Sequence, residues 1–228
     1  MVRRKDGNHK EIKELSADEL QAVIEKGLYV NENCDSGTFK HKKTAEYLEC
    51  AMYVCPYCGL SEFESHNDII TCKKCHREIR YSEKKELTGI SFSFPFRYVG
   101  DWYDYQNDYI NKLDITPYAD APVFKDEVSL FNVIFYKKKE LINKNVMLVA
   151  FNDRFELLKS DGNTVLSFED VFAVSVLGRN KLNIYFENGK KAYQIKGNKR
   201  FNALKYINFY YHCKNIREGN TNGKFLGL

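Results

Sequence analysis

Four cysteines in two closely spaced pairs are the residues whose types and spacing point most clearly to chemistry. Cys55-Pro-Tyr-Cys58 and Cys72-Lys-Lys-Cys75 are CxxC pairs, and thirteen residues separate them. Each pair can wrap a tight turn that directs both sulfurs to one point, so two such turns supply the four thiolates of a closed tetrahedral site. The pattern predicts a zinc ribbon with these ligands: Cys55, Cys58, Cys72 and Cys75.

Other uses of the four thiols fit the sequence less well. Two disulfides are disfavoured, because the charged start of the chain does not have the pattern of a signal peptide and reducing compartments keep thiols free. A redox site needs only one pair, while an iron–sulfur cluster is an alternative use of four cysteines. His66 and His76 lie near enough in sequence to replace a ligand. Four protein ligands leave no position for water, so we expect a structural metal and no catalytic residues.

Short strands and turns are expected to carry the two cysteine pairs. Residues 52–54 and 69–71 precede the pairs and have strand composition. Gly59 follows the first pair, at a position where a positive φ costs little. The other three cysteines are predicted to be buried small side chains, because free cysteine is among the most buried residue types: Cys34, Cys50 and Cys213.

Helices and one further strand are predicted on either side of the ribbon. Ser16-Ala-Asp-Glu19 has the composition of a capping box and predicts a helix that ends near Gly27. A second helix is expected over residues 44–52. Alternating aromatic residues predict a strand over 90–98. After Asp101, an aromatic stripe at helical spacing predicts a helix that packs on the ribbon or the next domain: Trp102, Tyr105, Tyr109, Ile110 and Leu113.

From residue 123 the pattern changes to short strands, tight turns and a closing helix. Asp161-Gly162 and Asn188-Gly189 are the clearest hairpin turns, because these residue types tolerate positive φ. An apolar stripe predicts a helix over about 199–217. Seven strands and a C-terminal helix follow the order of a pleckstrin-homology-like β-barrel, so the α+β class is predicted. The strands are expected at 127–136, 146–151, 155–159, 164–168, 171–177, 182–186 and 191–195.

Charge divides the chain into two parts. The 228 residues carry a net charge of +4, but residues 1–122 hold 17 basic and 21 acidic side chains, whereas residues 123–228 hold 18 and 10. Two prolines within 115–122 indicate a linker. No apolar run is long enough to cross a bilayer, and a hydrophobic content of 43% excludes wholesale disorder. The predicted domains are a helical segment (1–53), the ribbon (54–89), a connector (90–122) and the barrel (123–228).

Lysines in and beside the first turn of the barrel are the candidate anion-binding residues. Each lysine near an anionic bilayer contributes about 1 kcal/mol of attraction, which favours peripheral contact with acidic membrane. An ordinary solvated turn has the same composition and remains the alternative. The candidates are Lys137, Lys138, Lys139 and Lys144.

The order of several short motifs resembles a known family. Ala45-Glu-Tyr-Leu48 precedes the cysteine pairs, and Asp101-Trp102, Gly178-Arg-Asn-Lys-Leu182 and Ala203-Leu-Lys-Tyr206 follow them. Together they resemble the C-terminal region of Firmicute-type lysophospholipid acyltransferases, the 1-acyl-sn-glycerol-3-phosphate acyltransferase family. The resemblance covers nearly the whole chain. It implies a bacterial zinc-ribbon and barrel extension that follows a catalytic domain.

The catalytic motif of that family is missing from this sequence. Its chemistry uses a His-x4-Asp pair, and none of the five histidines has Asp five positions later. The resemblance therefore implies a non-catalytic accessory region of glycerophospholipid synthesis. Its expected partner is an acyltransferase catalytic domain in cis or in trans, and its expected place is the cytoplasm or the inner face of the membrane. An enzyme with unrecognised catalytic groups is a weaker hypothesis.

A zinc ribbon that binds nucleic acid is the alternative function. Basic and aromatic residues are the ingredients of a nucleic-acid surface, and both surround the second cysteine pair. Acidic residues in the same segment offset that charge, so nucleic acid is the less favoured partner. The basic residues concerned are Lys73, Lys74, Arg77 and Arg80.

Overall fold

The computed structural model describes residues 15–28, 37–134 and 139–220, and the chain divides into two compact units. The first unit, Met1–Gly37, contains helix α2 (Ala17–Leu28). The Ser16 hydroxyl accepts the Glu19 backbone N–H at 3.4 Å, and the Glu19 carboxylate accepts the Ser16 N–H at 2.8 Å. The predicted capping box is therefore confirmed. No residue of α2 is buried.

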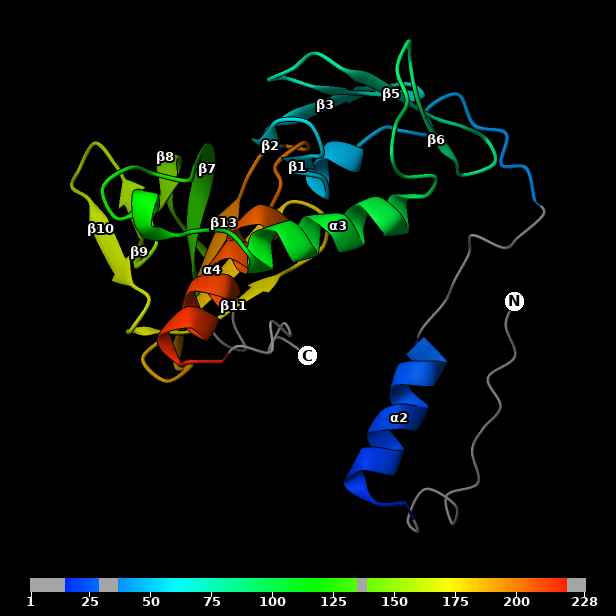
Figure 1. Cartoon of the computed structure of the whole chain (residues 1–228). Helices are drawn as coiled ribbons and strands as arrows, with labels where there is room; N and C mark the ends of the chain where they lie inside the picture. Colours follow the sequence, from blue (N-terminus) through cyan, green and yellow to red (C-terminus); the bar gives the residue numbers. More distant parts are fainter. Residues whose placement is uncertain (1–14, 29–36, 135–138, 221–228) are drawn as a thin grey trace. The chain divides into compact units, whose positions relative to one another are not determined.

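The second unit, Thr38–Leu228, holds the other described helices and every described strand (Figure 1). No helix among the described residues is long and apolar enough to cross a membrane. The elements are, in chain order, η2 (Leu48–Cys50), β1 (Val54–Cys55), β2 (Gly59–Leu60), β3 (Phe63–His66), β4 (Ile69–Cys72), β5 (Glu78–Tyr81), β6 (Leu87–Gly89), α3 (Val99–Asn111), η3 (Thr116–Tyr118), β7 (Phe124–Val133), β8 (Glu140–Ala150), β9 (Arg154–Leu158), β10 (Thr164–Ser167), β11 (Val171–Val176), β12 (Lys181–Phe186), β13 (Lys191–Lys196) and α4 (Leu204–Arg217).

Two small antiparallel sheets form the cysteine-bearing half of this unit. Strands β1 and β2 pair as a hairpin, and β3 to β6 form a four-stranded sheet in sequence order. Side chains alternate in β3, where Phe63 and Ser65 are buried and their neighbours are exposed. The apolar side of these strands contributes to one core together with Trp102, which is fully buried.

A single seven-stranded sheet forms the other half, with strands in the order β10-β9-β8-β7-β13-β12-β11. Neighbouring strands in this sheet are all antiparallel. Each of the seven predicted strands overlaps an observed one, and the predicted C-terminal helix is α4. The α+β class is thus confirmed. The sheet is not closed into a barrel, since β10 and β11 are its two edges and do not pair with each other. The predicted closure failed because a period-two pattern indicates strands without showing whether the outer two pair.

Helix α4 covers the seven-stranded sheet and is buried over most of its length (Figure 1). Tyr206, Phe209 and Tyr210 are fully buried in the core of the sheet. The Tyr210 hydroxyl donates to the Val171 carbonyl oxygen at 2.8 Å, which fastens the helix to strand β11. Before the helix, the Asn202 side chain accepts the backbone N–H of Lys205 at 3.1 Å and satisfies a free helix end.

Two predicted elements are wrong. Residues 44–52 contain only the 3₁₀ turn η2, because Tyr47 just before it has a φ of 73°, which an α-helix does not accommodate. Residues 90–98 form no strand, and β6 ends before them at Gly89. Its alternating phenylalanines pack against the core that contains Trp102, and the ring centroids of Phe94 and Trp102 are 5.2 Å apart.

Helix α3 connects the two cores. Near its N-terminus Trp102 packs in the core of the small sheets. Near its C-terminus Ile110 packs in the core of the seven-stranded sheet. Asp101 is the third helical residue, and its carboxylate accepts the backbone N–H of Tyr98 at 3.1 Å. The aromatic stripe therefore packs on both neighbours. The predicted linker at 115–122 lies inside the same compact unit.

Candidate metal centre

The four cysteines of the two CxxC pairs converge on one point. Their sulfur atoms all lie within 4.8 Å of one another. The Cys55 and Cys75 sulfurs are 3.7 Å apart, and those of Cys58 and Cys72 are 3.6 Å apart. A tetrahedron with metal–sulfur bonds of about 2.3 Å has edges of about 3.8 Å. The cluster therefore has the dimensions of a site for one tetrahedral ion.

These separations also decide between the alternatives for the thiols. A disulfide needs an S–S distance of about 2.05 Å, and all four cysteines are free. A cluster of several iron atoms holds its thiolates farther apart than a single ion does. The geometry thus favours a mononuclear centre.

The two turns that present the sulfurs share one backbone feature. Gly59, directly after Cys58, has a φ of 74°, and His76, directly after Cys75, has a φ of 58°. In both turns a left-handed residue reverses the chain after the second cysteine. A side chain at Gly59 would also clash with Tyr109, because an added Cβ would lie 2.6 Å from the Tyr109 hydroxyl oxygen. The sequence prediction for Gly59 is confirmed, and His76 is its counterpart.

Burial and hydrogen bonds shift the pKa values of the cysteine thiols in different directions at different residues. Burial raises the pKa of Cys55 and of Cys58. Burial also opposes ionisation of Cys75, but hydrogen bonds from the Arg77 backbone and side chain and from neighbouring thiols outweigh it and lower the pKa of Cys75 to about 6. The Ser61 hydroxyl lies 3.0 Å from the Cys72 sulfur. Four thiolates this close together repel one another, and a divalent cation offsets that repulsion.

Side chains of helix α3 form hydrogen bonds with the backbone that leads into the first CxxC turn. The Trp102 indole donates from Nε1 to the Val54 carbonyl oxygen at 2.8 Å. The buried Gln106 side chain accepts the backbone N–H of Tyr53 at 2.7 Å and donates to the Ala51 carbonyl oxygen at 3.0 Å. These bonds hold the strand that enters the first CxxC turn. Gln106 has no sequence pattern that marks it in advance.

The remaining cysteines and histidines lie outside the cluster. Cys50 and Cys213 are buried, as predicted, and Cys34 lies outside the described residues. His66 and His76 are exposed, and neither belongs to the group of four ligand atoms. The structure therefore gathers the four predicted ligands and no histidine among the described residues.

The basic residues near the second CxxC turn have local partners. Lys73 forms an ion pair with Glu62 at 3.0 Å, and Arg80 forms one with Asp68 at 3.0 Å. The Lys74 ammonium group donates to the Cys58 carbonyl oxygen at 3.0 Å. Much of the local positive charge is therefore balanced within the ribbon, which weakens its attraction for nucleic acid.

Two of the four predicted anion-binding lysines belong to the described residues. Lys137 and Lys138 lie outside the described residues. Lys139, just before β8, and Lys144, within β8, are both exposed. The Lys139 ammonium group donates to the Gln194 side-chain oxygen at 2.7 Å, so this residue reaches across to strand β13.

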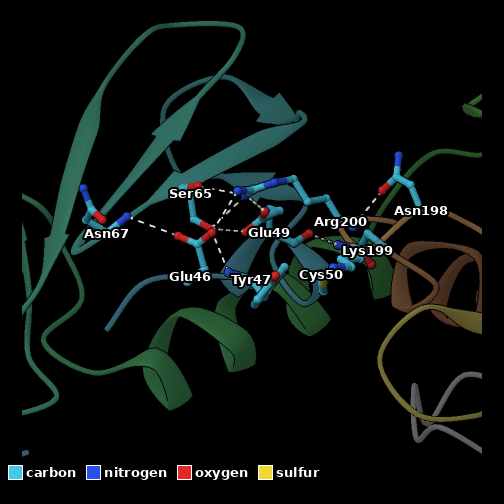
Figure 2. Close-up of polar contacts among 10 residues, drawn as sticks. Glu46, Tyr47, Glu49, Cys50, Ser65, Asn67, Asn198, Lys199 and Arg200 are labelled. Atoms are coloured by element: carbon cyan, nitrogen blue, oxygen red, sulfur yellow. Dashed lines mark hydrogen bonds and ion pairs between the residues drawn. The ribbon is translucent and has the colours of Figure 1, made fainter. Parts of the chain in front are cut away.

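A partly buried ionic junction joins the two halves of the unit and was not foreseen from sequence. Figure 2 shows Arg200 reaching Glu46, Glu49 and Ser65. One guanidinium nitrogen forms an ion pair with Glu49, and the other lies 3.0 Å from a Glu46 oxygen. The Glu49 side chain is only 3% exposed. Asn202 adds a bond from its side-chain nitrogen to the Glu49 carbonyl oxygen at 3.0 Å.

No family model matches the chain, and no curated protein was found that matches it.

Proposed function

We propose that the four-cysteine cluster binds zinc and that the ion is structural. Four thiolates in tetrahedral spacing are a preferred ligand set for zinc. They fill all four coordination positions, so the ion stabilises the turns and offers no place for a reacting water. This observation carries the proposal that the ribbon is a structural module of the chain.

The module is proposed to serve an acyltransferase of glycerophospholipid synthesis. Its motifs resemble the C-terminal extension of that family, and its second half carries a net charge of +8, from 18 basic and 10 acidic residues. The seven-stranded sheet with its covering helix has the strand order of a pleckstrin-homology-like fold. In this role the ribbon is a rigid connector, and the basic sheet contacts acidic membrane.

Metal analysis and vesicle flotation test the two parts separately. Purified protein is expected to contain one zinc per chain and to float with vesicles of phosphatidylcholine that contain phosphatidic acid. Flotation should weaken steeply with added salt, because the attraction is electrostatic. Equal, negligible binding to vesicles with and without phosphatidic acid would remove the membrane part. A metal content far below one per chain would remove the zinc part.

Oligonucleotide binding separates the alternative function from this one. A nucleic-acid ribbon binds at low salt, and its affinity falls linearly on a logarithmic scale as salt rises. We expect little binding to single- or double-stranded oligonucleotides, because Lys73 and Arg80 are paired with carboxylates. Tight, salt-sensitive binding that is lost when these two residues are replaced would favour the nucleic-acid function instead.

A further inference from the structure

Two lysines face each other across neighbouring strands of the seven-stranded sheet. Lys181 of β12 and Lys196 of β13 are direct partners in the antiparallel register. Leu182 and Ile195, the next pair along, are fully buried, so the two lysines lie on the opposite, outer side of the sheet. Like charges in directly opposite positions destabilise a sheet. This pairing therefore costs stability unless an anion offsets it.

A third lysine joins the pair from the β7–β8 connection. Lys139 donates to Gln194, which is two residues before Lys196 on β13, and its ammonium nitrogen lies 4.6 Å from the centroid of the Phe131 ring. Loss of hydration lowers the pKa of Lys139, and the charges of Lys181 and Lys196 lower it further. The three ammonium groups thus share one positive field.

Lys196 also lines a hollow of about 940 Å³, in which Lys144 and Lys199 add further positive charge. Its walls combine cationic side chains with amide and hydroxyl groups that can donate hydrogen bonds, and Glu127 is its one acidic lining residue. Further polar lining residues are Ser129, Lys144, Asn145, Asn180, Lys196, Asn198 and Lys199.

The lysines on this face and around the hollow have no carboxylate partners. Among the described residues, no ion pair includes Lys139, Lys144, Lys181, Lys196 or Lys199. On the same strand β13, by contrast, Lys191 pairs with Glu187 at 2.6 Å. Several uncompensated positive charges are therefore grouped on this face and around the hollow.

We propose that this outer face of the sheet is a binding site for phosphate groups, with Lys139, Lys181 and Lys196 around the phosphate and the adjacent hollow holding the rest of the ligand. Phosphate is a compact anion with several acceptor oxygens, which suits convergent ammonium and amide donors. The ligand class is a phosphate monoester, either a lipid headgroup or a small soluble phosphate. The inference deepens the proposed function and rests on it only for the lipid source.

The test compares two variants of the full, metal-loaded chain that lose the same charge. Lys181→Gln/Lys196→Gln removes the facing pair, and Lys190→Gln/Lys191→Gln removes two lysines in and after the β12–β13 turn. Glycerol 3-phosphate binding is measured by calorimetry, and binding to phosphatidylcholine vesicles with and without phosphatidic acid by sedimentation. At about fivefold per lysine, the first variant should lose about 25-fold in affinity. The second should lose less than about fivefold.

Thermal unfolding distinguishes a lost site from a damaged fold. Because Lys181→Gln/Lys196→Gln relieves repulsion, it should melt at the same temperature as the parent chain or higher. Equal losses of binding in the two variants, or no phosphate binding by the parent chain in either assay, would overturn the inference. Binding of glycerol 3-phosphate without binding to vesicles would support the site and contradict the membrane part of the proposed function.

Discussion

The metal centre and the Arg200 junction are both compact polar clusters, yet they are built in opposite ways. The four cysteines lie within 21 consecutive residues, and the Cys55 and Cys75 sulfurs are 20 positions apart in the chain. Arg200 and Glu49 are 151 positions apart. The metal centre can be predicted from the sequence, because cysteine is a rare residue type and the four ligands are closely spaced. The Arg200 junction consists of common residue types that come together only in the folded protein.

Removal of a metal ligand should have the largest effect. Cys72→Ser is expected to abolish stoichiometric zinc binding and to unfold the small sheets, because the binding free energy of structural zinc, on the order of 10 kcal/mol, is also folding free energy. Zinc content and near-ultraviolet circular dichroism measure the two consequences. A chelator should have the same effect on the parent chain.

Cys50→Ser is the matched control for this prediction. Cys50 is buried close to the ribbon but belongs to no metal-binding group among the described residues, and its thiol donates to the Lys199 carbonyl oxygen at 3.4 Å. Serine keeps a donor at this position, so zinc content should stay at one per chain. Loss of zinc from both variants would show that the cluster is not the binding site.

Disruption of the ionic junction ranks second. Arg200→Met leaves the Glu49 carboxylate buried beside Ser65 without its cation, which is expected to cost about 3 kcal/mol of unfolding free energy. Denaturant titration measures the loss. Adding Glu49→Gln should recover part of it, because the uncompensated charge is then gone. Lys199→Met, one residue away and exposed, should cost less than about 0.5 kcal/mol. Similar losses at both positions would contradict a specific junction.

Sequence patterns predicted the local features of this molecule and missed those that depend on distant contacts. The four ligands, the capping box at Ser16 and the positive φ at Gly59 follow from residue types over a few positions. The helix expected over 44–52 failed because Ala45, Glu49 and their neighbours pack against the ribbon strands and Arg200. The alternating phenylalanines of 90–98 pack against the core that contains Trp102, an arrangement that a strand pattern imitates.

The two left-handed residues after the cysteine pairs allow a finer comparison. Gly59→Ala should destabilise the protein by about 1–2 kcal/mol, because alanine is strained at a φ of 74° and its Cβ would press on the Tyr109 hydroxyl. His76→Gly relieves the same strain at the second turn, so its effect should be within about 1 kcal/mol of zero. Melting curves of the zinc-loaded proteins decide this, and a larger loss for His76→Gly would refute the assigned equivalence.

Thiol reactivity is the smallest predicted effect and leaves the fold unchanged. Burial raises the pKa of Cys213 to about 12 and that of Cys50 to about 11. A raised pKa means less thiolate at a given pH, so at pH 8 both should react with iodoacetamide at least about a hundredfold more slowly than an exposed thiol. Mass spectrometry of labelled peptides measures this. Rapid labelling of Cys213 in the folded, zinc-loaded protein would contradict its burial.

Helix α3 contributes to both cores, and this restricts where recombination can separate the coding sequences of the ribbon and the seven-stranded sheet. Trp102 completes the core of the small sheets, Ile110 completes the core of the seven-stranded sheet, and only eight positions separate the two residues. A recombination event on either side of the helix would leave Trp102 and Ile110 in the same product. The other product would then lack the side chain that completes its core. The ribbon and the sheet are therefore expected to be inherited together, as one heritable block, in any descendant that keeps either fold.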